Sequence, residues 1–184
     1  MKNIENIKEA LNDKEIIGLV IPDLGYDEML HEVAGLLSRD YKILYISIDK
    51  ACKSIAGKIE KVEPGIDTNK FYFIDCISRT SKYVPSEGNC TYVSSPRALD
   101  EVQQAVIDVL RGKEVNMAII DSPSSLLKYY EHVDVLKFMH LFMIKLLTAG
   151  CKGIFPFQRE SEGPLKRSVE MFVDEIVYLD EFEV

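Results

Sequence analysis

Four aspartates stand at or directly after apolar segments of this sequence, each of which has the character of a β-strand. They are Asp23, Asp49, Asp75 and Asp121. In an open sheet of parallel strands, ligands bind at the carboxyl ends of the strands, so these side chains can face one site. Carboxylate and hydroxyl oxygens suit a hard cation. One hypothesis is therefore a Mg²⁺ site that uses Asp49, Asp121 and the adjacent Ser122, with the ion supporting phosphoryl chemistry.

The first apolar segment begins a stretch that has the arrangement of a phosphate-binding loop. Residues 15–21 predict a buried strand, residues 22–25 a turn, and the residues after them a helix. A working loop ends in Gly-Lys-Ser/Thr at the start of that helix, where the lysine meets phosphate and the hydroxyl meets Mg²⁺. The candidate nucleotide-binding residues of this altered loop are Pro22, Asp23, Gly25, Tyr26, Asp27 and Glu28.

The altered loop carries negative charge where phosphate binding requires positive charge. Tyr26, Asp27 and Glu28 occupy the Gly-Lys-Thr positions. At about 4 Å and an effective dielectric of about 20, each contact between like charges costs about 4 kcal/mol. ATP hydrolysis by the usual route is therefore not expected. The alternative for Asp27 and Glu28 is a structural role, because acids in a first helical turn stabilise the helix dipole. Asp23 would then be a plain N-cap.

The composition is that of an ordinary globular protein with a net charge of −8. This charge argues against a nucleic-acid partner, because Lys and Arg contacts to phosphate dominate such binding. No apolar run approaches the ~20 residues that span a membrane. The charged start, MKNIENIKEALNDKE, does not resemble a signal peptide. We expect a cytoplasmic protein that binds neither nucleic acid nor membrane.

Apolar segments alternate with amphipathic ones along the chain. Several apolar segments are continuous, which is typical of parallel strands covered on both faces. The alternation predicts a single α/β domain over residues 1–184, with a three-layer, doubly wound, mainly parallel sheet and a helical extension at 1–14. Strands are expected at 15–21, 42–48, 71–77, 91–94, 115–121, 152–157 and 175–180, and helices at 2–12, 26–38, 50–60, 97–111, 132–149 and 163–172.

The cysteines and histidines lack the spacing of known metal motifs. The four cysteines have no CxxC pattern and lie in apolar or helical segments, which predicts buried, reduced thiols. A disulfide between Cys76 and Cys90 is the alternative if their segments are adjacent. The three histidines are expected to be structural. The chain also lacks the Gly-x-Ser-x-Gly elbow of α/β-hydrolases and the glycine-rich dinucleotide fingerprint.

The order of the segments resembles the RecA-like ATPases, and within them the KaiC-like branch of archaea and bacteria. KILYISID resembles the family's second strand, and SSPRALDEVQQAVIDVL the helix before its Walker B strand. MAIIDSPSSLL resembles the Walker B strand itself, with Asp121 and Ser122 as its Asp-Ser pair. FYFIDCIS, LKFMHLFMIKLLTAGCKGIFPF and FVDEIVYLD resemble other strands and a helix of the family. The resemblance covers about residues 15–180 and implies a RecA-like fold.

The chain departs from this family where the chemistry would occur. The second strand normally ends in a catalytic glutamate, whereas Asp49 followed by Lys50 stands here. Together with the altered loop, the resemblance implies a KaiC-like pseudo-ATPase with a degenerate Walker A motif. Such a protein would be regulatory or scaffolding, acting through a protein partner or self-association, with no cofactor expected. The alternatives are an atypical enzyme that binds ATP or Mg²⁺ through the strand-end aspartates, and a purely structural subunit.

Overall fold

A computed structural model describes residues 2–86, 88–160 and 163–180 of the protein. Strands and helices alternate along these residues. The elements are α1 (Lys2–Asp13), β1 (Ile16–Ile21), α2 (Tyr26–Leu37), β2 (Ile43–Ser47), α3 (Cys52–Val62), η1 (Thr68–Lys70), β3 (Phe71–Asp75), η2 (Ser78–Thr80), β4 (Cys90–Tyr92), α4 (Leu99–Gly112), β5 (Met117–Asp121), η3 (Pro123–Lys128), α5 (His132–Thr148), β6 (Lys152–Gln158), α6 (Pro164–Val169) and β7 (Glu175–Tyr178).

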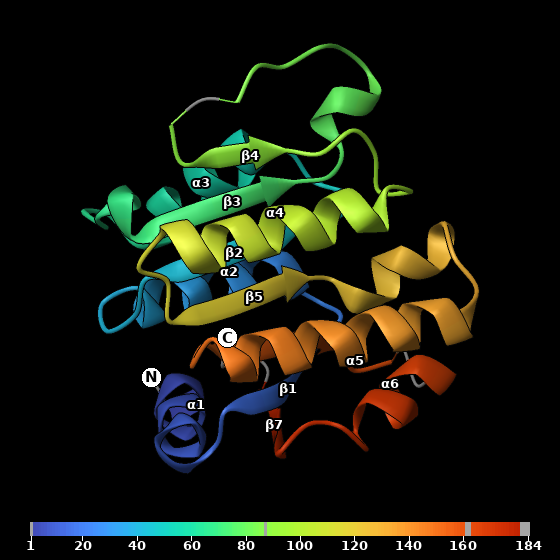
Figure 1. Ribbon diagram of the computed structural model, residues 1–184. Helices are drawn as coiled ribbons and strands as arrows, with labels where there is room; N and C mark the ends of the chain where they lie inside the picture. Colours follow the sequence, from blue (N-terminus) through green and yellow to red (C-terminus); the bar gives the residue numbers. More distant parts are fainter. Residues whose placement is uncertain (1, 87, 161–162, 181–184) are drawn as a thin grey trace.

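The seven strands form one sheet in the order β4-β3-β2-β5-β6-β1-β7 (Figure 1). All six pairings between neighbouring strands are parallel. The chain moves from β1 to β2, outward to β4, and then returns so that β5 and β6 lie between β2 and β1. The carboxyl ends of β1, β2 and β5 therefore lie along the edge where this class of sheet binds ligands.

Helices cover both faces of the sheet. Helices α1, α2 and α3 pack on one face, and α4, α5 and α6 pack on the other (Figure 1). Successive strand residues point to opposite faces, so Tyr45 and Ile119 lie in the first core and Leu44 and Ile120 in the second. Helix α1 belongs to the first core, because Leu11 is fully buried there.

The three-layer parallel α/β architecture predicted from the sequence is confirmed. Each expected strand and helix is present, with small shifts at its ends. Three short 3₁₀ segments, η1 to η3, were not expected, since three to six residues carry too little periodicity to read. Among the described residues, no helix is both long and apolar enough to cross a membrane.

Candidate functional site

The expected strand–turn–helix frame is present at the carboxyl end of β1. The strand ends at Ile21, residues 22–25 form the turn, and α2 begins at Tyr26. Gly25 is the N-cap of α2 and has a left-handed backbone, with φ of 78°. The expectation that Asp23 caps the helix is wrong. Its carboxylate instead accepts a hydrogen bond from the amide of Glu160, at 3.1 Å, which joins this turn to the end of β6.

The turn between β1 and α2 is shorter than a phosphate-binding loop. A loop of the Gly-x-x-x-x-Gly-Lys type has six residues from the first glycine to the second, and their amides surround the phosphates. Only residues 22–25 lie between the strand and the helix here. Pro22, which has no amide hydrogen, is one of them. Four residues with three amide donors cannot form the same anion cradle.

A lysine from another loop lies beside the start of α2. Lys50 follows β2, and its Nζ atom lies 2.7 Å from Oδ1 of Asp27 and 3.1 Å from Oδ2 of Asp121. The Tyr45 hydroxyl donates a hydrogen bond to the same Asp121 oxygen, at 3.0 Å. The Lys50 ammonium also lies 5.8 Å from the centre of the Tyr26 ring. We call these five residues the Lys50 cluster.

The sequence predicts uncompensated negative charge at the start of α2, and the Lys50 cluster shows that this expectation is wrong. Asp27 and Glu28 do lie in the first turn of α2, as the structural alternative requires. The Asp27 carboxylate is not an unpaired negative charge, however, because it bonds to Lys50 and lies 3.8 Å from the Lys58 ammonium. The site therefore has a lysine beside the strand-end Asp121, and Lys50 comes from the β2–α3 loop and is bound to carboxylates.

Burial and charge both act on the ionisable groups of this cluster. Burial raises the pKa of Asp121, and the charge and hydrogen bond of Lys50 only partly offset it. Burial alone would lower the pKa of Lys50, but Asp121 and Asp27 outweigh burial and raise it. Burial alone would raise the pKa of Asp27, but the hydrogen bond and charge of Lys50 outweigh burial and lower it. Lys50 is thus held as a cation between its two partners.

Tyr26 fills the space beneath the lysine. Its side chain is buried, and its hydroxyl makes no hydrogen bond of ordinary geometry. Burial raises its pKa well above the ordinary value, and the charge of Asp121 acts in the same direction, whereas nearby Ser122 lowers it. A neutral aromatic ring therefore lies at the first position of α2, beside the lysine.

The predicted metal ligands divide into two groups. Asp121 belongs to the Lys50 cluster, whereas Asp49 accepts hydrogen bonds from Ser125, at 2.9 Å, and Lys128, at 2.6 Å. Ser122 lies between the groups, with its hydroxyl 3.2 Å from that of Ser125. Asp49 does not cap α3, since Ala51 is the N-cap. A metal at Asp49, Asp121 and Ser122 stays a prediction, and it would have to displace both lysines.

Asp75 is a structural residue rather than part of an acidic cluster. Its carboxylate is fully buried and accepts four hydrogen bonds, from the amides of Cys52, Ile77 and Ser78 and from the Ser78 hydroxyl. These donors occupy the roughly four lone-pair positions of a carboxylate. No three of the strand-end aspartates come within 4.8 Å of one another. Among the described residues, the set that does so is Cys52, Asp75 and Cys90.

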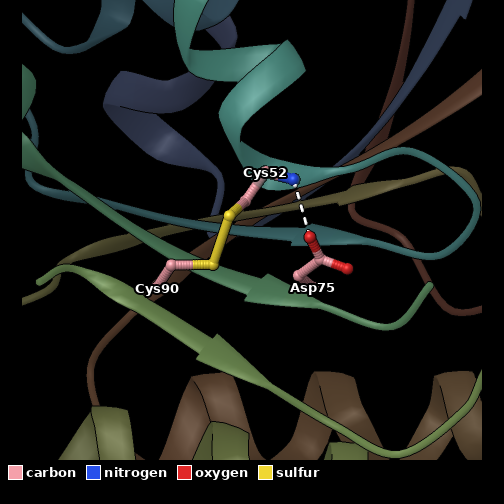
Figure 2. Close-up of side chains that lie close together, drawn as sticks. All are labelled: Cys52, Asp75 and Cys90. Carbon is pink, nitrogen blue, oxygen red and sulfur yellow. Dashed lines mark hydrogen bonds between the residues drawn. A yellow bond between two sulfur atoms is a disulfide. The ribbon is translucent and has the colours of Figure 1, made fainter. Parts of the chain in front are cut away.

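Cys52 and Cys90 form a disulfide, which joins the first residue of α3 to the first residue of β4 (Figure 2). The expectation of reduced thiols is therefore wrong for these two residues, and the alternative pair Cys76–Cys90 is also wrong. The expectation holds for Cys76 and Cys151, which are free and buried. Burial raises the pKa of Cys151 to about 12 and that of Cys76 still higher.

Fold and site together define a three-layer α/β domain with a parallel sheet of the RecA-like kind, whose first strand–helix turn is short and whose strand-end Asp121 is bound to a lysine. No known protein-family model matches the chain, and no curated protein matches it significantly.

Sequence reasoning missed two residues of the site. Lys50 gave a weak signal, because it follows a strand-end aspartate in a loop at the ligand-binding edge. Its partner Asp27 is 23 positions away, so only the strand order brings the two together. Tyr45 gave no signal, because it lies within an apolar strand and its hydroxyl becomes relevant only beside Asp121.

Proposed function

We propose that the protein is a KaiC-like pseudo-ATPase: a RecA-fold protein that does not hydrolyse ATP and acts through protein–protein contacts. The observation that carries the proposal is the Lys50 cluster. Lys50 Nζ is bonded to Asp27 and Asp121, the residues that stand where a P-loop lysine and a magnesium-holding aspartate would be. An internal ion pair thus takes the place that phosphate and metal would need.

The energetics of the cluster favour this interpretation. A phosphate that bound to Lys50 would have to separate it from Asp121. The Asp121 carboxylate, which is only 1% exposed, would then be left without its cation. Breaking a buried ion pair costs about 3–5 kcal/mol. The short turn offers few amide donors in return. A nucleotide therefore forms fewer hydrogen bonds here than in a working loop, and its binding must also break the ion pair between Lys50 and Asp121.

The alternative, an atypical enzyme that binds Mg²⁺ or ATP through strand-end aspartates, has less support. Each strand-end carboxylate already has a partner: Lys50 for Asp121, Lys128 for Asp49, four hydrogen-bond donors for Asp75 and the Glu160 amide for Asp23. A cation must replace these partners as well as lose its own water.

An exposed apolar stripe supports the part of the proposal that concerns protein contacts. Along α5, four large apolar side chains at helical spacing are each about half exposed, and we call them the α5 stripe: Val133, Leu141, Ile144 and Leu147. Leu141, Ile144 and Leu147 follow one another at intervals of three residues, whereas the exposed Lys137 and His140 separate them from Val133. Neighbouring exposed apolar side chains mark interaction sites more often than isolated ones do. We propose self-association through this stripe. The cytoplasmic location expected from the charged amino-terminal segment stays a prediction.

The test is a thermal-shift titration of the protein with ATP, ADP and GTP, each with and without Mg²⁺, and with Mg²⁺ alone. A ligand at about 100 times its dissociation constant stabilises a protein by about 2.7 kcal/mol. We expect no shift in melting temperature under any of these conditions. A shift that requires both nucleotide and Mg²⁺ would reject the proposal, and a shift with Mg²⁺ alone would favour the aspartate alternative. The Asp121→Asn variant then shows whether the ligand binds at the strand ends.

A further inference from the structure

We propose that Cys52 and Cys90 are a reversible redox site that exchanges with small thiols or dithiols, independently of the proposed function. The two cysteines lie far apart in the sequence and meet over β3, where Cys90 stands beside Phe73 in the sheet. The bond connects the start of a helix to a three-residue edge strand. The surroundings of the two sulfur atoms give each of them a different part in the exchange.

Access favours attack at Cys90. Its side chain is partly exposed, whereas Cys52 is 3% exposed. An open hollow of about 310 Å³ lies against the pair and is also lined by Lys53, Thr68 and Asn89. This volume is at the lower end of the range for small-molecule sites.

The environment of Cys52 suits the leaving group. Cys52 is the first residue of the eleven-residue helix α3, where the helix dipole favours a thiolate. The Tyr92 hydroxyl lies 3.5 Å from its sulfur and can donate a hydrogen bond to it. The Cys52 amide is held by the Asp75 carboxylate, at 2.8 Å, so the start of α3 stays in place when the sulfur is released (Figure 2).

The exchange proceeds in two balanced steps. A thiolate RS⁻ attacks Sγ of Cys90, the R–S to Sγ bond forms, the Sγ–Sγ bond breaks, and its electron pair leaves on Sγ of Cys52. A second RS⁻ attacks the mixed disulfide at the sulfur from R, which releases the Cys90 thiolate and forms RSSR. Two external thiols are oxidised, one protein disulfide is reduced, and the two thiol protons pass to Cys52 and Cys90.

A metal is the competing use of this pair, because Cys52, Cys90 and Asp75 lie close enough to hold one. The hydrogen bonds of Asp75 argue against it. Both of its oxygens already accept two donors each, so metal coordination would remove bonds that hold the starts of α3 and η2. Without Asp75, two thiolates remain, and a structural zinc site requires four ligands.

The test equilibrates the native protein in glutathione buffers of graded redox ratio, stops exchange with acid, and then unfolds and alkylates the protein for mass measurement. We expect one two-electron transition, in which Cys52 and Cys90 change from unmodified to fully alkylated together. Cys76 and Cys151 serve as internal controls, because these free thiols are alkylated at every ratio and set a constant baseline. With oxidised glutathione, Cys52→Ser should take up one glutathione on Cys90, whereas Cys90→Ser should take up none on the buried Cys52.

Several outcomes would overturn the proposal. A bond that persists at every ratio in the native protein would make the disulfide inert and structural, and thiols that never pair under oxidising conditions would remove the disulfide. Stoichiometric Zn²⁺ binding by the reduced protein, lost in Asp75→Asn, would make the pair a metal site instead. The wild-type titration decides the question even if a serine variant fails to fold.

Discussion

At the scale of single residues, Lys50 is the group on which the candidate site depends. Its charge neutralises a buried aspartate that would otherwise lose its hydration without compensation. Isolated buried charge costs several kcal/mol, and a buried pair is tolerated only while both partners are present. Lys50, which pairs with Asp121 at the candidate site, is therefore also expected to stabilise the fold.

Replacing Lys50 tests this expectation. We expect Lys50→Met to lower the free energy of unfolding by about 3 kcal/mol, because Asp121 is left buried with only the Tyr45 hydroxyl. The double variant with Asp121→Asn should recover at least about 1 kcal/mol of that loss, since the uncompensated charge is then gone. Urea unfolding of the two single variants and the double variant measures both values.

Lys58→Met is the matched control for this cycle. Lys58 also lies near Asp27, at 3.8 Å, but its side chain is about half exposed. Exposed pairs contribute little, so this variant should change the stability by less than about 0.5 kcal/mol. Equal unfolding midpoints for the two lysine variants would contradict the central position given to Lys50.

His31 is a second buried ionisable residue whose effect depends on pH. It is 1% exposed, and its Nε2 atom has no hydrogen-bond partner. Burial lowers its pKa from 6.5 to about 4, and the charge of Asp27 only partly opposes this. The folded pKa lies below the unfolded value, so the unfolded chain binds more protons between these values. Stability is therefore complete above the unfolded pKa and is lost as the pH falls towards the folded pKa.

As the pH falls from about 7 to about 5, we expect His31 to lower the free energy of unfolding by about 2 kcal/mol, because the unfolded chain takes up a proton there and the folded chain does not. His31→Gln cannot take up a proton in this range and should lack that part of the pH dependence, whatever its stability at neutral pH. Denaturant unfolding of both proteins at several pH values gives the difference between the two slopes. Parallel curves for the two proteins would show that His31 titrates alike in the folded and unfolded chains.

At the scale of elements, the short β1–α2 turn depends on the backbone of Gly25. Its φ of 78° lies in the left-handed region, where a Cβ atom costs about 1–2 kcal/mol. We expect Gly25→Ala to destabilise the protein by about 1 kcal/mol. Gly57→Ala is the control, because Gly57 lies within α3 and a Cβ there meets nothing within 4 Å. That variant should gain about 0.5–1 kcal/mol of stability from helix propensity. Thermal unfolding should therefore show a lower melting temperature for Gly25→Ala and a higher one for Gly57→Ala.

The sequence predicted the elements far better than the site, for a physical reason. Buried parallel strands are continuous apolar runs and helices have their own period, so β2 and α5 can be recognised from neighbouring residues alone. The Lys50–Asp121 pair and the Cys52–Cys90 bond depend on strand order and side-chain reach, which no local pattern records. The position of Asp121 at a strand end was predictable, but its partner was not.

At the scale of the whole molecule, net charge and apolar surface act against each other. Each copy carries a charge of −8, so two copies repel one another at low ionic strength. The α5 stripe must supply enough apolar burial to overcome this repulsion. If it does, self-association should strengthen as salt screens the charges, whereas contacts based on ion pairs would weaken.

Sedimentation velocity over a range of protein and salt concentrations tests this. We expect reversible self-association that increases with salt and that Leu141→Glu weakens by about 2 kcal/mol, or roughly 30-fold, because a charge is buried in the contact. Leu24→Glu makes the same chemical change at a leucine that is 90% exposed and lies outside the stripe, so it should leave association unchanged. If both variants weaken association alike, added charge rather than the α5 stripe is responsible, and a wild-type protein that stays monomeric throughout would refute self-association.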